Sequence, residues 1–206
     1  MTRRHIMSNV TRLAAVAVVA VISASCGGDL LLTGRGATYL TIMGLQARPG
    51  GGSEIADNLL SDVATAAGSI FNDLGVAVIR NELKDCGCLA GTPATPTSIN
   101  SVTLTRYRVV YRRTDGRNTP GVDVPFGFDG VITATIPAGD ERTVVFDIVR
   151  HANKAEPPLR NLVQLGGQFI ISTVAEITFF GRDQNGNELS VSGMMDVTFG
   201  DFPDDE

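Results

Sequence analysis

Apolar and polar residues alternate along most of the chain after residue 75. A period of two places successive side chains on opposite faces of an extended strand, so this pattern predicts half-buried β-strands. Strands with one apolar and one polar face are typical of antiparallel sheets. The alternating apolar positions form four runs: Phe126, Phe128, Ile132, Ala134 and Ile136; Val144, Phe146 and Ile148; Phe169, Ile171, Ala175, Ile177 and Phe179; and Leu189, Val191, Met195, Val197 and Phe199.

Three earlier segments also favour strands, namely residues 38–47, 76–83 and 102–113. In the third, the apolar phase changes between Leu104 and Tyr107, which predicts either a β-bulge or a strand covered on both faces. Residues 183–187 separate the last two alternating runs and contain Asn-Gly, the strongest short signal for a β-hairpin. The C-terminal part of the chain is therefore predicted to be a hairpin.

Residues 53–68 have a different period. Ser53 is a suitable N-cap, Gly68 is a suitable stop, and the apolar residues between them recur at the spacing of a helical face. These are Ile55, Leu59, Leu60, Val63, Ala64 and Ala67. The pattern predicts a short helix within residues 54–67.

About seven strands joined by polar turns, with one short helix, indicate an all-β fold. The strand number and alternation resemble antiparallel β-sandwiches of the immunoglobulin and fibronectin type III kind, with Greek-key connections. This resemblance is architectural, because the tryptophan and the spaced cysteine pair of antibody domains are absent. A small β-barrel is the alternative.

The N-terminal region has the composition of an export signal. Arg3, Arg4 and Arg12 supply positive charge, residues 13–22 are apolar, and Ser23-Ala24-Ser25 precedes Cys26. The pattern resembles the signal peptide of bacterial lipoproteins, which implies cleavage before Cys26 and a diacylglycerol thioether on its sulfur. Ordinary secretory cleavage after Ser23 or Ser25 is the alternative. The apolar run is too short for a transmembrane helix, which needs about 20 residues.

These features divide the chain into three parts. Residues 1–25 are predicted to be a lipoprotein signal peptide, residues 26–36 a glycine-rich tether, and residues 37–206 an immunoglobulin-like domain. The resemblance implies a protein of the bacterial cell envelope that is anchored to a membrane by lipid. Gly27 and Gly28 follow the cysteine, where an aspartate directly after it would imply inner-membrane retention in enterobacteria. The outer membrane is therefore favoured.

The exported part of the chain is acidic. Removing residues 1–25 takes away three of the 17 basic side chains and none of the 22 acidic ones, so the formal net charge becomes −8. An acidic surface repels phosphate backbones, and nucleic acid is not expected as a partner.

Cys86 and Cys88 form an even pair once Cys26 carries lipid. Because only Gly87 separates them, a disulfide between them would close a very small loop and remove little entropy from the unfolded chain. A local disulfide or two inert thiols is the favoured interpretation. The alternative is an envelope metal-binding or redox protein that uses this pair.

Catalytic motifs are weak in this sequence. His151 is the single histidine of the exported part, and no nucleophile motif accompanies it. Asp140 with Glu141 is better explained by a turn than by a pair of carboxylates that converge across a cleft. We expect no enzymatic activity and no catalytic residue.

Calcium is the most credible cofactor, although none is expected. Asp183, Asn185, Asn187 and Glu188 place oxygen ligands close together at the predicted hairpin turn, and Asp201 follows a neighbouring strand. The same turn is the alternative site for the metal-binding interpretation. The Asn-Gly pair is already explained by the geometry of the turn.

Two long loops are candidate binding surfaces. Residues 117–125 include Arg117, Asn118 and Asp123, and residues 85–97 form the second loop. Long loops on rigid β scaffolds frequently carry recognition. The alternative for residues 117–125 is a connection in which Pro120 and Pro125 protect an edge from pairing. The sequence predicts a non-catalytic binding, assembly or structural module with an envelope protein as its partner.

Overall fold

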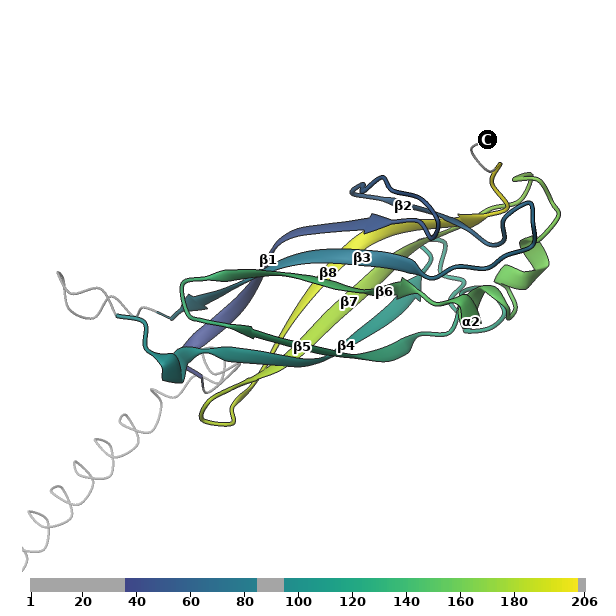
Figure 1. Cartoon of the computed structure of the whole chain (residues 1–206). Coiled ribbons are helices and arrows are strands. Elements are labelled where there is room, and N and C mark those ends of the chain that lie inside the picture. The colour runs from purple at the N-terminus through teal and green to yellow at the C-terminus, as the bar shows by residue number, and fades with distance from the viewer. Residues whose placement is uncertain (1–35, 85–94, 204–206) are drawn as a thin grey trace, which may run out of the picture. The chain divides into compact units, whose positions relative to one another are not determined.

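The computed structural model describes residues 36–84 and 95–203, which fold around one hydrophobic core. One sheet has three strands in the order β1-β3-β6, and the other has five in the order β2-β8-β7-β4-β5 (Figure 1). The strands are β1 Thr38–Arg48, β2 Leu59–Asp62, β3 Asp73–Leu83, β4 Val102–Arg112, β5 Phe128–Ile136, β6 Glu141–Val149, β7 Ile171–Asp183 and β8 Glu188–Gly200. The predicted all-β sandwich is confirmed, and the two separate sheets replace the alternative of a closed barrel.

The strand order follows the Greek-key pattern. The chain leaves the five-stranded sheet after β5, enters the other sheet as β6 beside β3, and returns as β7 beside β4. The hairpin at residues 183–187 is confirmed, because β7 and β8 pair antiparallel from Ile171 with Phe199 to Arg182 with Glu188.

The prediction of a helix within residues 54–67 is wrong. Residues 59–62 form β2, which runs parallel to β8, and Ala56 makes an isolated bridge with Ala47. Leu59 and Ser61 are buried while Leu60 is exposed, which is the alternation of a strand. A helix this short has a costly nucleus, and the open edge of β8 offers the backbone hydrogen bonds that the segment takes instead. Its one parallel pair also departs from the predicted purely antiparallel arrangement.

The phase change in β4 is a β-bulge, one of the two predicted explanations. The register shifts between Leu104 and Arg106 against both neighbouring strands. The extra residue of the bulge shifts the alternation of side chains by one position. Leu104 before it and Tyr107, Val109 and Tyr111 after it therefore all face the core.

Aromatic rings fill the centre of the sandwich. Phe146 meets Phe179 edge-on with ring centroids 5.2 Å apart, and Tyr107 lies 5.2 Å from Phe146. These rings bring side chains of both sheets together in geometries that favour the aromatic quadrupoles. Tyr111 adds a polar link between the sheets, because its hydroxyl donates to the carbonyl of Ile148 at 2.6 Å. Burial raises the pKa of Tyr111 well above its usual value, so this hydroxyl keeps its proton.

The domain has two distinct ends, which Figure 1 shows on its left and right. At one end β1 begins beside the end of β3, and β4 begins beside the β7–β8 turn. A Cβ placed on Gly36 would lie 3.1 Å from Oδ2 of Asp183, so the chain enters the domain there, and we name it the Gly36 end.

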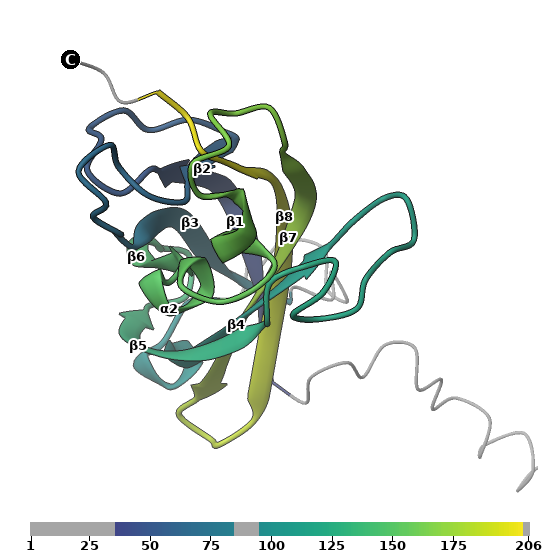
Figure 2. The ribbon, with the colours of Figure 1, turned by 90° about the vertical axis from the view of Figure 1, so that its right-hand side faces the viewer.

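The opposite end carries the long connections, shown towards the viewer in Figure 2. They are residues 49–72 between β1 and β3, residues 113–127 between β4 and β5, and residues 150–170 between β6 and β7. The last includes α2 (His151–Lys154) and the 3-10 helix η3 (Leu159–Leu162). A further 3-10 helix, η2 (Ser98–Asn100), lies before β4. We name this the α2 end.

Candidate functional site

The loop of residues 113–127 has a defined shape. The backbone N–H of Asp123 donates to the carbonyl of Thr119 at 2.8 Å, and the Thr119 N–H donates to Oδ2 of Asp123 at 3.1 Å. Val124 is buried in the core, and the side chain of Asn153 donates to the carbonyl of Phe126 at 2.7 Å. The loop is thus tied at its tip, at its buried valine and to α2.

The predicted binding residues of this loop maintain its conformation. Oδ1 of Asn118 accepts the backbone N–H of Arg113 at 2.6 Å, and the guanidinium of Arg117 contacts the Asp115 carboxylate at 2.9 Å. Asp115 also accepts a 2.6 Å hydrogen bond from Arg113. The two guanidiniums hold the pKa of Asp115 well below its usual range, and Arg113 makes the larger contribution. Arg117, Asn118 and Asp123 therefore each use polar groups to hold the loop in shape.

The loop also presents two large apolar side chains to solvent, beside its exposed polar residues. Val122 is 68% exposed, and Phe126 is 49% exposed with its ring packed over Gly121. Gly121 has a φ of +76°, which a residue with a side chain rarely adopts, and a Cβ there would collide with the ring. Glycine at this position therefore permits both the turn and the position of Phe126.

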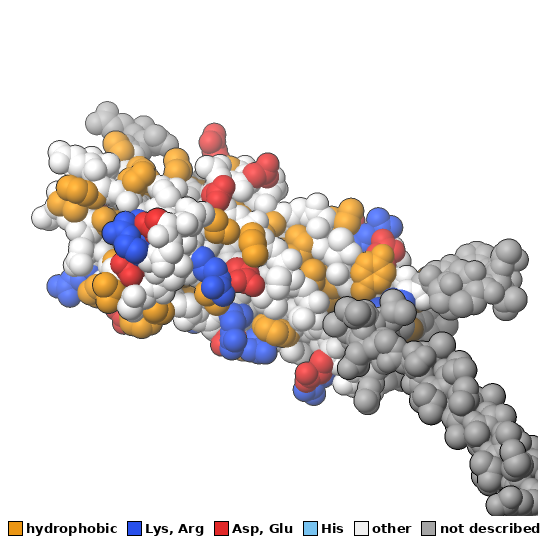
Figure 3. Space-filling model, turned by 180° about the vertical axis from the view of Figure 1, so that it is seen from behind, with side chains coloured by type: hydrophobic (Ala, Val, Ile, Leu, Met, Phe, Trp, Pro, Cys, Tyr) orange, Lys and Arg blue, Asp and Glu red, His pale blue; other side chains and the backbone are white. Residues whose placement is uncertain are grey.

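Exposed apolar side chains are concentrated at the α2 end. Of the fifteen large exposed hydrophobic residues in the described part of the chain, nine lie in the connections at this end or in β2. These are Ile55, Leu60, Ile70, Phe71, Val122, Phe126, Leu165, Phe169 and Ile170. Figure 3 shows hydrophobic side chains among the loops at this end, on the left of the view. A gathering of apolar groups on fixed loops is a feature of interaction sites.

Sequence patterns misplaced two members of this surface. The alternating pattern predicts Phe126 and Phe169 on buried strand faces, but β5 begins at Phe128 and β7 begins at Ile171. Both rings precede their strands and are exposed. An aromatic residue that continues the alternation of a strand can be its first residue or can stand just before it. The sequence pattern is the same in both cases, so it does not show where the strand begins.

The turn at residues 183–188 uses its oxygen ligands internally. Oδ1 of Asp183 accepts the backbone N–H groups of Asn185 and Asn187 at 2.9 and 2.8 Å, and its Oδ2 accepts the side-chain amide of Asn187 at 2.8 Å. Glu188 instead pairs with Arg182 at 2.6 Å. The structure brings three of the four predicted ligands together, and N–H donors occupy both oxygens of the aspartate. Within the described ranges, no group of three or more His, Cys, Asp or Glu side chains is arranged to hold a metal ion.

Acid is expected to weaken this turn. Burial raises the pKa of Asp183, but the hydrogen bonds from Asn187, Asn185 and Gly186 outweigh it, and the net pKa lies below the usual value. A depressed folded-state pKa contributes stability above the unfolded pKa of about 3.9 and loses it as the pH falls towards the folded pKa. Asp183→Asn should therefore destabilise the domain at pH 7, with a smaller difference from wild type below about pH 4. Urea unfolding at both pH values measures this, and an unchanged difference would contradict it.

The remaining candidates from the sequence are simply located. Cys26, Cys86 and Cys88 lie outside the described residues, as does most of the 85–97 loop. His151 is exposed at the start of α2, where its Nδ1 lies 3.1 Å from Oδ1 of Asn72. Asp140 and Glu141 lie where the β5–β6 turn enters β6.

Arginines on β4 are matched by carboxylates. Arg108 contacts both oxygens of Asp129 at 3.0 Å, and Arg106 reaches the same carboxylate at 2.9 Å. Arg112 lies 3.3 Å from Glu176 on β7. The outer face of this sheet thus carries paired charges.

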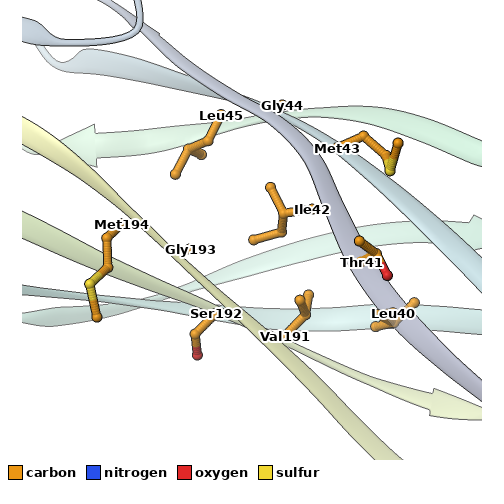
Figure 4. A pocket seen from close by; sticks show the side chains of 10 residues that line it. All are labelled: Leu40, Thr41, Ile42, Met43, Gly44, Leu45, Val191, Ser192, Gly193 and Met194. Atoms are coloured by element: carbon orange, nitrogen blue, oxygen red, sulfur yellow. The ribbon is translucent and has the colours of Figure 1, made fainter.

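A groove between β1 and β8 was not anticipated from the sequence. Its volume is about 490 Å³, and its lining comes from residues 40–45 and 191–194 (Figure 4). Ile42 and Leu45 lie over Gly193, where a Cβ would come within 2.8 Å of Cδ1 of Ile42. β8 pairs with β2 only at residues 197–200, so among the described strands the preceding part of β8 has no partner on this side. The sequence features at this groove are Gly193 in β8 and Gly44 in β1, where the register with β3 shifts between Ile42 and Gly44.

Comparisons with known proteins identify no relative of this chain. No protein-family model matches the chain, and no curated protein was found to be related to it. Across residues 36–84 and 95–203, no helix has the length and apolar character needed to cross a bilayer.

Proposed function

We propose that this protein is a non-catalytic binding module of the bacterial cell envelope, held by a lipid on Cys26 and binding an envelope protein through its α2 end. The observation that carries the proposal is the concentration of exposed apolar side chains on fixed loops at the end opposite Gly36. A lipid on Cys26 and a tether of residues 26–36 would attach at the Gly36 end. The exposed apolar side chains lie at the other end of the domain from this attachment point.

The rigidity of residues 113–127 supports this function. Binding costs less conformational entropy when a loop already has its bound shape, and this loop is held by its own hydrogen bonds and by α2. Val122 is an exposed apolar side chain within the hydrogen-bonded turn of residues 119–124, so it can make a contact without rearrangement of the loop. The glycines after Cys26 favour the outer membrane as the site of anchoring.

The β1–β8 groove is a second candidate surface for the same function. An extended peptide segment of a partner could add to the unpaired part of β8, a mode of recognition in which main-chain hydrogen bonds supply affinity. Met43 and Met194 are exposed beside it, and flexible thioether side chains adapt to varied apolar partners.

Recovery of partners from cells tests the proposal and separates the two surfaces. Val122→Glu and Phe169→Glu should each reduce recovery of a crosslinked envelope partner about tenfold or more, because a charge buried against an apolar contact costs more than about 1.4 kcal/mol. Val131→Glu is the matched control, since Val131 is 87% exposed on β5, outside the α2 end.

The variants also define the outcomes. Recovery unchanged by Val122→Glu and Phe169→Glu would remove the α2 end as the binding surface. Loss with Met194→Glu alone would transfer the function to the groove. The alternative function, a metal-binding or redox protein that uses Cys86 and Cys88, predicts retained metal or a thiol state that follows the ambient redox potential. Metal analysis and thiol titration of the purified protein measure these directly.

A further inference from the structure

A lysine and an aspartate lie in contact inside the domain. Asp73, the first residue of β3, is fully buried, and Lys154, the last residue of α2, is 2% exposed. Nζ of Lys154 lies 2.8 Å from Oδ1 of Asp73. The two residues are 81 positions apart in the sequence, and their contact joins the three-stranded sheet to the β6–β7 connection.

Two further donors surround the Asp73 carboxyl group. The backbone N–H of Gly50 donates to Oδ1 at 2.7 Å, and the hydroxyl of Ser61 donates to Oδ2 at 2.6 Å. Ser61 is itself fully buried in β2. Both carboxyl oxygens are thus held by fixed donors, and the amine of Lys154 is held beside the carboxyl group.

This environment penalises charge. Two ions removed from water lose hydration that their mutual attraction repays only partly. Burial raises the pKa of Asp73 above its usual value, although Lys154 and the other donors act in the opposite direction. Transfer of one proton from the ammonium to the carboxylate, along the hydrogen bond between them, gives a neutral amine and a neutral carboxylic acid.

We propose that Lys154 and Asp73 become joined by an isopeptide bond between Nζ and Cγ. The neutral amine attacks Cγ of the carboxylic acid, and the N–H of Gly50 and the hydroxyl of Ser61 stabilise the negative charge that develops on oxygen. The tetrahedral intermediate expels its hydroxyl group, which takes a proton from the nitrogen and leaves as water. One amide and one water form from one amine and one acid, so no oxidant or other reactant is needed.

The packing around Lys154 and Asp73 favours formation of the amide. Groups held at contact distance by a folded scaffold react as if at effective concentrations of about 10⁵–10⁸ M, which offsets the low reactivity of a carboxylic acid towards an amine. The product replaces two buried charges with a neutral amide, whose carbonyl oxygen is placed to keep a hydrogen bond from Gly50 or Ser61. A covalent link here would fasten β3 to α2 at the base of the proposed binding surface, but its formation does not depend on that function.

Peptide mapping of the full chain tests the bond directly. The protein purified from cells is denatured and digested with trypsin, and the peptides are identified by mass spectrometry. Arg48 is followed by Pro49, so the Asp73 peptide runs from Gly36 to Arg80, while Lys154 lies in a peptide of residues 151–160 when cleavage after it is blocked. We expect one branched species whose mass is the sum of these two peptides less one water.

Lys154→Arg is the control, because it keeps a cation opposite Asp73 but has no primary amine. It should show only linear peptides. Branched peptides linked through Asp73 and Lys154 in the wild type, and absent from Lys154→Arg, establish the bond. Complete recovery of the linear peptides, with cleavage after Lys154, from wild-type protein that unfolds cooperatively would overturn the proposal.

Discussion

Asp73→Ala is expected to lower the free energy of unfolding by about 3–5 kcal/mol, the loss typical of removing one partner from a buried ion pair. The substitution leaves the amine of Lys154 in an apolar interior without its acceptor. It also removes the acceptor of the Ser61 hydroxyl and of the Gly50 N–H, which join β2 and the β1–β2 connection to β3. The effect is therefore expected whether Lys154 and Asp73 are ionic or covalently joined. Urea unfolding at pH 7 measures it.

A second variant separates the lost contact from the stranded charge. Adding Lys154→Met to Asp73→Ala removes the buried amine and replaces it with an apolar chain of similar length, so part of the lost stability should return. Arg112→Ala is a suitable control, because its ion pair with Glu176 is exposed and should contribute about 0–1 kcal/mol. A loss for Asp73→Ala no greater than that for Arg112→Ala would contradict the role assigned to the buried pair.

Cys26→Ala is expected to move nearly all of the protein from the membrane fraction to the soluble fraction. A diacylglycerol group supplies two acyl chains, and each buried methylene contributes about 0.8 kcal/mol to membrane affinity, whereas the alanine variant has no acyl chain. Fractionation of cells expressing the full chain, followed by immunoblotting, measures the distribution. The mass of the N-terminal peptide of the wild type reports the lipid in the same samples.

Cys86→Ala with Cys88→Ala is the matched control for the anchor, since it removes thiols while leaving Cys26. This variant should remain with the membrane. Continued membrane association of Cys26→Ala would show that another part of the chain, or a bound partner, tethers the protein.

Much of the sandwich could be predicted because its strands are half-buried. Ala175, Ile177 and Phe179 of β7 are fully buried, and the residues between them are half-buried. Buried positions therefore recur at every second residue, and the alternation of apolar residues in the sequence identifies them. The Asn-Gly turn could be predicted because few residues adopt the backbone conformation that it needs. β2 could not, because its four residues acquire their conformation from an edge of β8 that lies more than 130 positions later.

The functional features were less accessible to sequence patterns. Asp73 and Lys154 stand alone in the sequence, and neither belongs to a periodic run or a motif that would associate them. Val122 does not stand out in the sequence, because it is a single apolar residue in a loop that also contains the polar residues Asn118 and Asp123. In the structure, those polar groups hold the loop, and the side chain of Val122 is exposed to solvent.

Photocrosslinking from two positions of the domain tests most directly the claim that a partner binds through the α2 end. A photoreactive amino acid is placed at position 122 in one full-length variant and at position 131 in another, and both are irradiated in intact cells. The proposed function predicts a discrete adduct with one envelope protein from position 122, on the α2 end, and no such adduct from position 131. No adduct from position 122, or the same adducts from both positions, would contradict binding through the α2 end.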